Sequence, residues 1–234
     1  MQKNNNLSFI KSDGEVIDFL KENIDNVLKR RNFEIIGEVY NTRNITECDR
    51  RILYRAYGVK SDGIKSEIEF SKNDIFSENA IKEKWLTIFE DILNVKVRET
   101  FITASDCNYN LIGEIDGAGV IGNKPVIFMI RKVNHEEFEN ISKNEINRKD
   151  KVDILAKMWM IEVKHGILLY EDGNTNDYQL FHVTPYEPII QSVCTKCKRL
   201  EDHRILGKLP DRPYKDALGT ECLSCEFKLK CWDK

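Results

Sequence analysis

The sequence predicts an α/β protein with a small mixed sheet flanked by helices. Apolar residues follow helical spacing up to about residue 95, short runs rich in Val, Ile and Phe begin at Val97, and helical spacing returns at Asn147. We expect one compact unit with three regions. These are an N-terminal helical region over 1–95, an α/β core over 96–186, and a C-terminal helix with a cysteine cluster over 187–234.

Three helices are predicted in the N-terminal region. Ser12 and Glu15 have capping-box spacing, and apolar residues at helical positions follow to about residue 31. Two further helices are predicted over 46–58, with Cys48 near its start, and over 78–93. Basic clusters at 29–31 and 50–55 are typical of helix ends or solvated faces, and otherwise of a local groove for nucleic acid.

The core is predicted to begin with a three-strand meander. Its strands are expected over 99–105, 111–121 and 125–133, all rich in β-branched and aromatic residues. After them the pattern predicts a helix over 147–164, strands over 166–172 and 178–184, and a last helix over 187–206.

Composition and charge limit the function classes. Hydrophobic residues make up 41% and charged residues 32%, which is ordinary for a globular protein. No apolar run approaches the roughly 20 residues of a membrane helix, and the first residues lack a targeting pattern, so we expect a cytoplasmic protein without a membrane partner. The net charge of −3 gives no overall attraction to nucleic acid, so DNA binding would require a local groove.

The cysteines indicate a metal site. Three of the seven, Cys222, Cys225 and Cys231, crowd the last thirteen positions, which is not typical of a secreted disulfide scaffold. Three thiolates on one loop can hold a metal centre, but a closed site needs a fourth ligand from elsewhere in the chain. Cys48 is the candidate.

A second cysteine arrangement stays open. Cys194 and Cys197 form another C-x2-C pair, and with Cys222 and Cys225 they would make a zinc-ribbon pattern. Cys194 and Cys197 also follow the helical spacing of their apolar neighbours, so they fit equally as small apolar residues that face a core.

The segments ECDRRILYRAYG and CLSCEFKLKCW resemble the bracketing cysteines of the iron-sulphur RecB-type PD-(D/E)XK nucleases. This family includes the CRISPR-adaptation exonucleases and phage relatives. The resemblance spans about 43–232 and implies a restriction-endonuclease-like core. It also implies a [4Fe-4S] cluster that joins the N- and C-terminal segments, held by Cys48, Cys222, Cys225 and Cys231. A cluster that links Cys48 to Cys222 closes a long loop, and such a link strongly reduces the conformational freedom of the unfolded chain.

The resemblance also identifies the positions of a nuclease site. Such a site needs an Asp on one strand and a Glu-x-Lys on the next, so that two carboxylates hold Mg²⁺ or Mn²⁺. Asp116 fits the first position, but Met129 stands at the Glu position and Arg131 at the Lys position. A thioether is a poor ligand for a hard cation, whereas arginine keeps the positive charge.

Further family positions are substituted. Lys82, beside Glu83, stands where the family has a histidine, and Asp153 and Lys157 stand where it has Gln and Tyr. The resemblance therefore implies a catalytically inactive member. We expect it to bind DNA or to act as a scaffold with a protein partner, in a phage or mobile-element replication, recombination or defence complex.

Two alternatives remain. Glu162 and Lys164 form a literal Glu-x-Lys that would serve as a relocated site with Asp116 in an active Mg²⁺- or Mn²⁺-dependent DNA exonuclease. The residues before them keep helical spacing, so the same pair fits as charged residues at a helix end. The second alternative is a zinc-binding module for protein-protein interaction.

Overall fold

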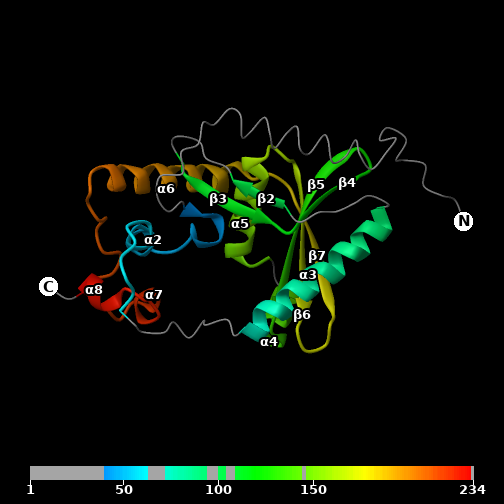
Figure 1. The fold of residues 1–234 in the computed structure, drawn as a ribbon, viewed down its shortest axis with the longest axis horizontal. Coiled ribbons are helices and arrows are strands. Elements are labelled where there is room, and N and C mark those ends of the chain that lie inside the picture. The colour runs from blue at the N-terminus through cyan, green and yellow to red at the C-terminus, as the bar shows by residue number, and fades with distance from the viewer. Residues whose placement is uncertain (1–39, 63–71, 94–99, 104–108, 144–145, 233–234) are drawn as a thin grey trace, which may run out of the picture.

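The computed structural model describes residues 40–62, 72–93, 100–103, 109–143 and 146–232. The helix and the basic cluster predicted before residue 32, and Cys107, lie outside the described residues. Two small sheets and their flanking helices form the described part of the chain (Figure 1). None of the described helices is long and apolar enough to cross a membrane.

The smaller sheet has the strand order β1-β3-β2. Strand β1 (Tyr40–Asn41) runs parallel to β3 (Leu111–Ile115), and β2 (Thr100–Thr103) runs antiparallel to β3.

The larger sheet has the order β4-β5-β6-β7. Strand β5 (Lys124–Val133) pairs antiparallel with β4 (Gly117–Ile121) and parallel with β6 (His165–Asp172), and β7 (Tyr178–Val183) pairs antiparallel with β6. A parallel pair needs a long crossover, which α4 (His135–Lys143) and α5 (Arg148–Met160) provide. The predicted mixed sheet with flanking helices is confirmed.

The predicted meander is wrong in one respect. The segment 111–121 is not one strand, because the chain leaves the smaller sheet at the end of β3 and enters the larger sheet at β4. Asp116 lies at this transition, where its carboxylate accepts a hydrogen bond from the Ile130 amide at 2.7 Å. The apolar pattern runs through the break because Leu111, Gly113 and Ile115 of β3 and most of β4 are buried.

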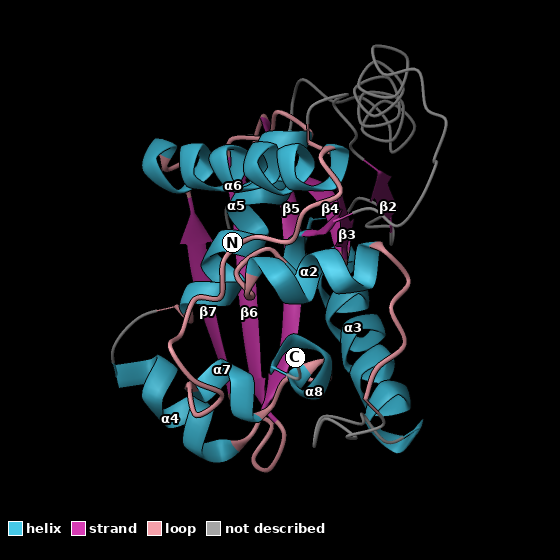
Figure 2. Cartoon of the chain, turned by 90° about the vertical axis from the view of Figure 1, so that its left-hand side faces the viewer, coloured by secondary structure: helices cyan, strands magenta, loops and turns pink. Residues whose placement is uncertain are grey.

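Strand β5 is covered on both faces. Ile127 and Met129 belong to the core cluster that includes α5, whereas Phe128 and Ile130 pack with Trp85 of α3 (Lys72–Leu93). Figure 2 shows the strands between these helices, with α6 (Glu187–Ile205) beside α5. A strand buried on both faces reads as a continuous apolar run, which explains why 126–130 lacks alternation.

Two helix predictions needed correction. Helix α5 ends at Met160 rather than 164, because Glu162 adopts a φ of 59°, the left-handed conformation that ends a helix. Helix α4 was not predicted, since few of its residues are apolar; Phe138 and Ile141 are the ones it buries in the core.

The early and late segments of the described chain meet in one lobe. Helix α2 (Asp49–Ala56) lies near α7 (Thr220–Leu223) and α8 (Lys228–Trp232), at the left of Figure 1. The Asp62 amide donates to the Glu226 carbonyl at 2.8 Å, and the Tyr54 and Phe227 rings lie 5.3 Å apart. The predicted joining of the two segments is therefore present in the fold.

Candidate functional site

Asp116 is enclosed by cations. Its side chain is buried between β3 and β4, with the residue 4% exposed. Lys82 Nζ of α3 lies 2.9 Å from Asp116 Oδ1, and an Arg131 guanidinium nitrogen lies 3.5 Å from Oδ2. Together with the Ile130 amide, these groups occupy both carboxylate oxygens.

Met129 and Arg131 lie on the face of β5 that α5 covers, because residues two apart on a strand share a face. Arg131 reaches two carboxylates of α5, at 2.8 Å from Asp153 Oδ2 and 3.3 Å from Asp150 Oδ1. The structure thus brings together Asp116, Met129 and Arg131, as the sequence predicted.

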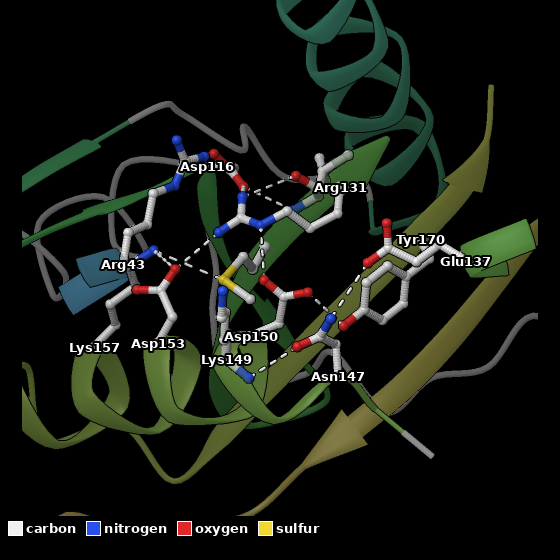
Figure 3. Close-up of polar contacts among 12 residues, drawn as sticks. Arg43, Asp116, Arg131, Glu137, Asn147, Lys149, Asp150, Asp153, Lys157 and Tyr170 are labelled. Atoms are coloured by element: carbon white, nitrogen blue, oxygen red, sulfur yellow. Dashed lines mark hydrogen bonds and ion pairs between the residues drawn. The ribbon is translucent and has the colours of Figure 1, made fainter. Parts of the chain in front are cut away.

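Helix α5 completes the arrangement with Asp150, Asp153 and Lys157 (Figure 3). Lys157 Nζ lies 2.9 Å from Asp153 Oδ2 and 3.7 Å from Met129 Sδ. The Tyr170 hydroxyl donates to Asp150 Oδ2 at 2.7 Å. Three cations therefore face three carboxylates in what we call the ion-pair cluster: Lys82, Asp116, Arg131, Asp150, Asp153 and Lys157.

The electrostatics follow from this pairing. Burial alone would raise the pKa of Asp116, but Arg131, Lys82 and the Ile130 amide outweigh burial, so the pKa is lowered. Burial lowers the pKa of Lys157, and the charge of Asp153 opposes that shift without cancelling it. For Arg131, the surrounding carboxylates outweigh burial and raise the pKa.

This geometry does not fit a divalent metal ion. Mg²⁺ needs several free oxygen ligands, and cations or an amide already occupy the oxygens of Asp116. Asp153 Oδ1 is the one carboxylate oxygen of the cluster that is buried without a hydrogen-bond partner in the described residues. No group of three or more His, Cys, Asp or Glu side chains in the described part of the chain is arranged to hold a metal ion.

The alternative pair Glu162 and Lys164 is not brought to Asp116. Both residues are exposed and precede β6, whose first residue, His165, pairs with Val126. Asp116 instead binds the amide of Ile130, four strand residues further along. At about 3.3 Å per residue, the offset along the strand alone is roughly 13 Å.

The four predicted cysteine ligands do come together. Cys48, Cys222, Cys225 and Cys231 all line one cavity between α2, α7 and α8. All four are free thiols in the described part of the chain. Several cationic and aromatic side chains line the same cavity: Arg50, Arg51, Tyr54, Lys228 and Trp232.

The cavity offers donors to the sulphur atoms. Cys48 is the N-cap of α2, without a side-chain capping hydrogen bond; burial raises the pKa of its thiol, and the nearby backbone amides of Arg51 and Arg50 oppose that rise. Burial likewise raises the pKa of Cys225, against the Phe227 amide. Four thiols with nearby N–H donors and cations have the chemistry of an anionic metal-thiolate centre, which is stabilised by such donors, although as placed in the described residues they do not form a group arranged to hold a metal ion.

Cys194 and Cys197 do not line this cavity. Cys197 is fully buried in the main core, and burial raises its pKa to about 12. Cys194 accepts a hydrogen bond from Tyr109. The interpretation of this pair as core-facing residues of a helix is confirmed for Cys197.

Two features were missed in the sequence. Asp150 shares Arg131 with Asp153, and its spacing of three residues from Asp153 on a helix was the available signal. The basic cluster at 50–55 is expected at a helix end or on a solvated face; Arg55 does lie in the last turn of α2, but the arginines of the cluster are half-buried rather than solvated. Arg51 and Arg55 are ion-paired with Glu226 at 2.5 and 2.6 Å, and Arg50 donates to the Pro210 carbonyl at 2.9 Å.

No protein-family model and no curated protein matches the sequence. The fold does resemble solved structures. The crystal structure of a protein named SSO0001 matches with a TM-score of 0.51 and 15% identity, over 92% of this chain and 95% of that chain. LHK-Exo, an alkaline exonuclease from Laribacter hongkongensis, matches in its complex with dAMP, with a TM-score of 0.51 and 10% identity, over 72% of this chain and 89% of that one. The chain therefore has a nuclease-like exonuclease fold.

Proposed function

We propose that the protein is a catalytically silent member of the nuclease fold that binds DNA phosphates without a divalent metal ion. The observation that carries this proposal is the pairing of Asp116 with Lys82 and Arg131. Ammonium and guanidinium groups stand where a metal ion would have to bind, and Met129 offers it no oxygen.

Charge balance supports the same conclusion. A divalent ion placed beside Asp116 would meet the positive charges of Lys82 and Arg131 at short range, in a site with little water to screen them. The carboxylates of α5 compensate little, because Arg131 and Lys157 already occupy Asp153 Oδ2 and Arg131 and Tyr170 bind Asp150, which leaves Asp153 Oδ1 as the one unpartnered carboxylate oxygen of the cluster in the described residues.

Support for DNA as the ligand comes from the fold and from positive charge near the cluster. LHK-Exo, which shares the fold, was solved with dAMP. In this chain, Arg43 of the 3-10 helix η1 (Thr42–Asn44) is exposed and extends toward Asp116 (Figure 3). Arginine suits phosphate because its planar fork can donate two parallel hydrogen bonds.

A scaffold role with a protein partner, which we place in a phage or mobile-element complex only on the family resemblance, has separate support. Half of the ten exposed large apolar side chains of the described residues lie between 205 and 229: Ile205, Leu206, Leu218, Leu223 and Leu229. Exposed apolar residues that concentrate in one part of a chain are typical of a protein-binding surface.

The cysteine cavity completes the proposal. We infer that Cys48, Cys222, Cys225 and Cys231 hold a [4Fe-4S] cluster, with zinc as the rival occupant. Such a centre, when bound, would fasten the two ends of the chain in the way that structural metal sites do. Its proposed role is structural.

A paired nuclease and binding assay tests the DNA proposal. With Mg²⁺ or Mn²⁺ we expect no cleavage of single- or double-stranded DNA, and with EDTA we expect DNA binding that weakens steeply as salt rises. Arg43→Gln should weaken binding and lower the salt slope by about 1, because it removes the exposed arginine that extends toward Asp116 as a phosphate donor. Metal-dependent cleavage that disappears in Asp116→Ala would contradict the proposal.

Glu162→Ala is the matched control for the relocated site. Glu162 is exposed and distant from Asp116 along the strand, so we expect the variant to bind DNA as the unsubstituted protein does. If cleavage is observed and Glu162→Ala abolishes it, the active exonuclease is correct instead.

A further inference from the structure

We infer that Arg50 and Trp232 donate hydrogen bonds to the sulphur atoms of the metal-thiolate centre in the cysteine cavity, and so control how tightly that centre is held. This inference rests on the proposed centre. It concerns two residues that are not ligands, and it holds for either an iron-sulphur cluster or a zinc ion.

Arg50 has a buried N–H group, that of Nε, without an acceptor in the described residues. Its two terminal nitrogens donate to the Pro210 carbonyl at 2.9 Å and to the Tyr54 hydroxyl at 3.2 Å. The side chain lines the cavity and contacts the Cys231 thiol. The guanidinium is therefore anchored at its far end while its Nε–H remains available beside the cysteines.

Trp232 repeats this pattern. Its Nε1 is also buried without a partner in the described part of the chain, and its ring lines the same cavity. Arg212 lies 4.7 Å from the ring centroid and donates through Nε to the Cys231 carbonyl at 2.9 Å. The indole is thus fixed in position next to the ligand that precedes it in the sequence.

Three residues that line the cavity, Arg50, Arg51 and Trp232, have a buried N–H group without a hydrogen-bond partner in the described residues. Arg51 Nε lies 3.5 Å from Glu47 Oε2, so it is the N–H groups of Arg50 and Trp232 that need an explanation. A buried donor without an acceptor costs about 1–3 kcal/mol. Trp85 shows the normal situation in this protein, because its buried Nε1 donates to Glu171. The acceptor that fits the surroundings of Arg50 and Trp232 is a metal-bound thiolate or sulphide, since four cysteine sulphurs line the same space.

The N–H groups of Arg50 and Trp232 would stabilise the centre by offsetting its negative charge. Four thiolates around a metal carry excess negative charge, and hydrogen bonds from N–H groups spread it. We therefore expect Arg50 and Trp232 to slow the loss of metal. In an iron-sulphur cluster they also favour the more negative, reduced state and so raise the reduction potential.

The test uses the full chain, purified without oxygen and analysed for iron, sulphide and zinc. Trp232→Phe keeps the ring and removes the N–H, whereas Arg50→Lys keeps the charge and removes Nε. Trp159→Phe is the control, since Trp159 lies on α5 and packs edge-on against Tyr109, outside the cavity. The measurement is the rate at which a chelator removes the metal.

We expect Trp232→Phe and Arg50→Lys to lose metal about tenfold faster than the unsubstituted protein, as is common when a partner of a metal ligand is removed. Trp159→Phe should not differ. If iron is found, the midpoint potential should fall by on the order of 59 mV, which is a tenfold change for a one-electron couple.

The metal-free forms separate this role from ordinary packing. Without metal, Trp232→Phe should be at least as stable to urea as the unsubstituted protein, because it removes an N–H that has no acceptor. The inference is overturned if metal-free Trp232→Phe is less stable than the unsubstituted protein, or if Trp232→Phe and Arg50→Lys both lose metal at the unsubstituted rate. Neither result contradicts the proposed metal centre. A preparation that takes up neither iron nor zinc overturns the proposed centre itself.

Discussion

The ion-pair cluster and the cysteine cavity are both polar regions inside the fold, but they differ in how far the chain satisfies them. In the ion-pair cluster each of the three carboxylates faces at least one cation. In the cysteine cavity, four thiols share the space with N–H groups of Arg50 and Trp232 that have no acceptor in the described residues. The charges of the ion-pair cluster balance without a ligand. The cysteine cavity, in contrast, has hydrogen-bond donors that lack an acceptor in the described residues.

This difference indicates whether each region gains free energy from binding a further ion. A buried ion pair is stable when its own members neutralise one another, and an added divalent ion would disturb that balance. A cavity with unused donors gains free energy when an anionic group enters it. We therefore expect the ion-pair cluster to be insensitive to metal ions and the terminal lobe to depend on one.

Cys231→Ser should have the largest effect, because it removes a ligand of the proposed centre. Structural zinc sites in small peptides contribute about 10–16 kcal/mol to folding. We expect the segment after α6 to become sensitive to protease and the melting temperature to fall further than in any other variant proposed here. Cys194→Ser, outside the cavity, is the control. Equal protease resistance of the two variants would contradict the dependence on metal.

Arg131→Met should have the next largest effect. It leaves Asp116 and Asp153 with one cation fewer in a buried setting, and breaking a buried pair costs about 3–5 kcal/mol. Urea unfolding measures the loss. Lys164→Met replaces an exposed lysine and should change stability by less than about 0.5 kcal/mol. A small loss for Arg131→Met would mean that the cluster is not tightly coupled.

Acid should have the smallest effect on the free energy of unfolding, and it should lower that free energy. The pKa of Asp116 is lowered in the folded state, so this carboxylate contributes stability above its unfolded pKa of about 3.9, and that contribution is lost as the pH falls through the folded value. Unfolding free energies measured between pH 7 and pH 2 should drop below about pH 4. Asp116→Asn should show a smaller drop, and an equal drop would assign it to other carboxylates.

Most of the candidate site was accessible from the sequence. The spacing of the cysteines and the frame that placed Met129 and Arg131 after Asp116 depend on local patterns, and the structure brings each set together. The break of the strand at Asp116 was not accessible, because both halves are apolar and the change of sheet depends on a hydrogen bond to Ile130. The position of Arg50 was hidden for a similar reason, since Tyr54 lies one helical turn away but the other partner, Pro210, comes from a distant part of the chain.

The sequence by itself determined the fold class, because apolar periodicity defines most helices and strands before any long-range contact forms. It also determined which residue types stand at the positions that the family resemblance assigns to a nuclease site. Only the tertiary structure decided what these residues do together. Lys82 and Lys157 read as isolated substitutions in the sequence, but folding brings them to Asp116 and Asp153, where opposite charges pair at short range in a buried site.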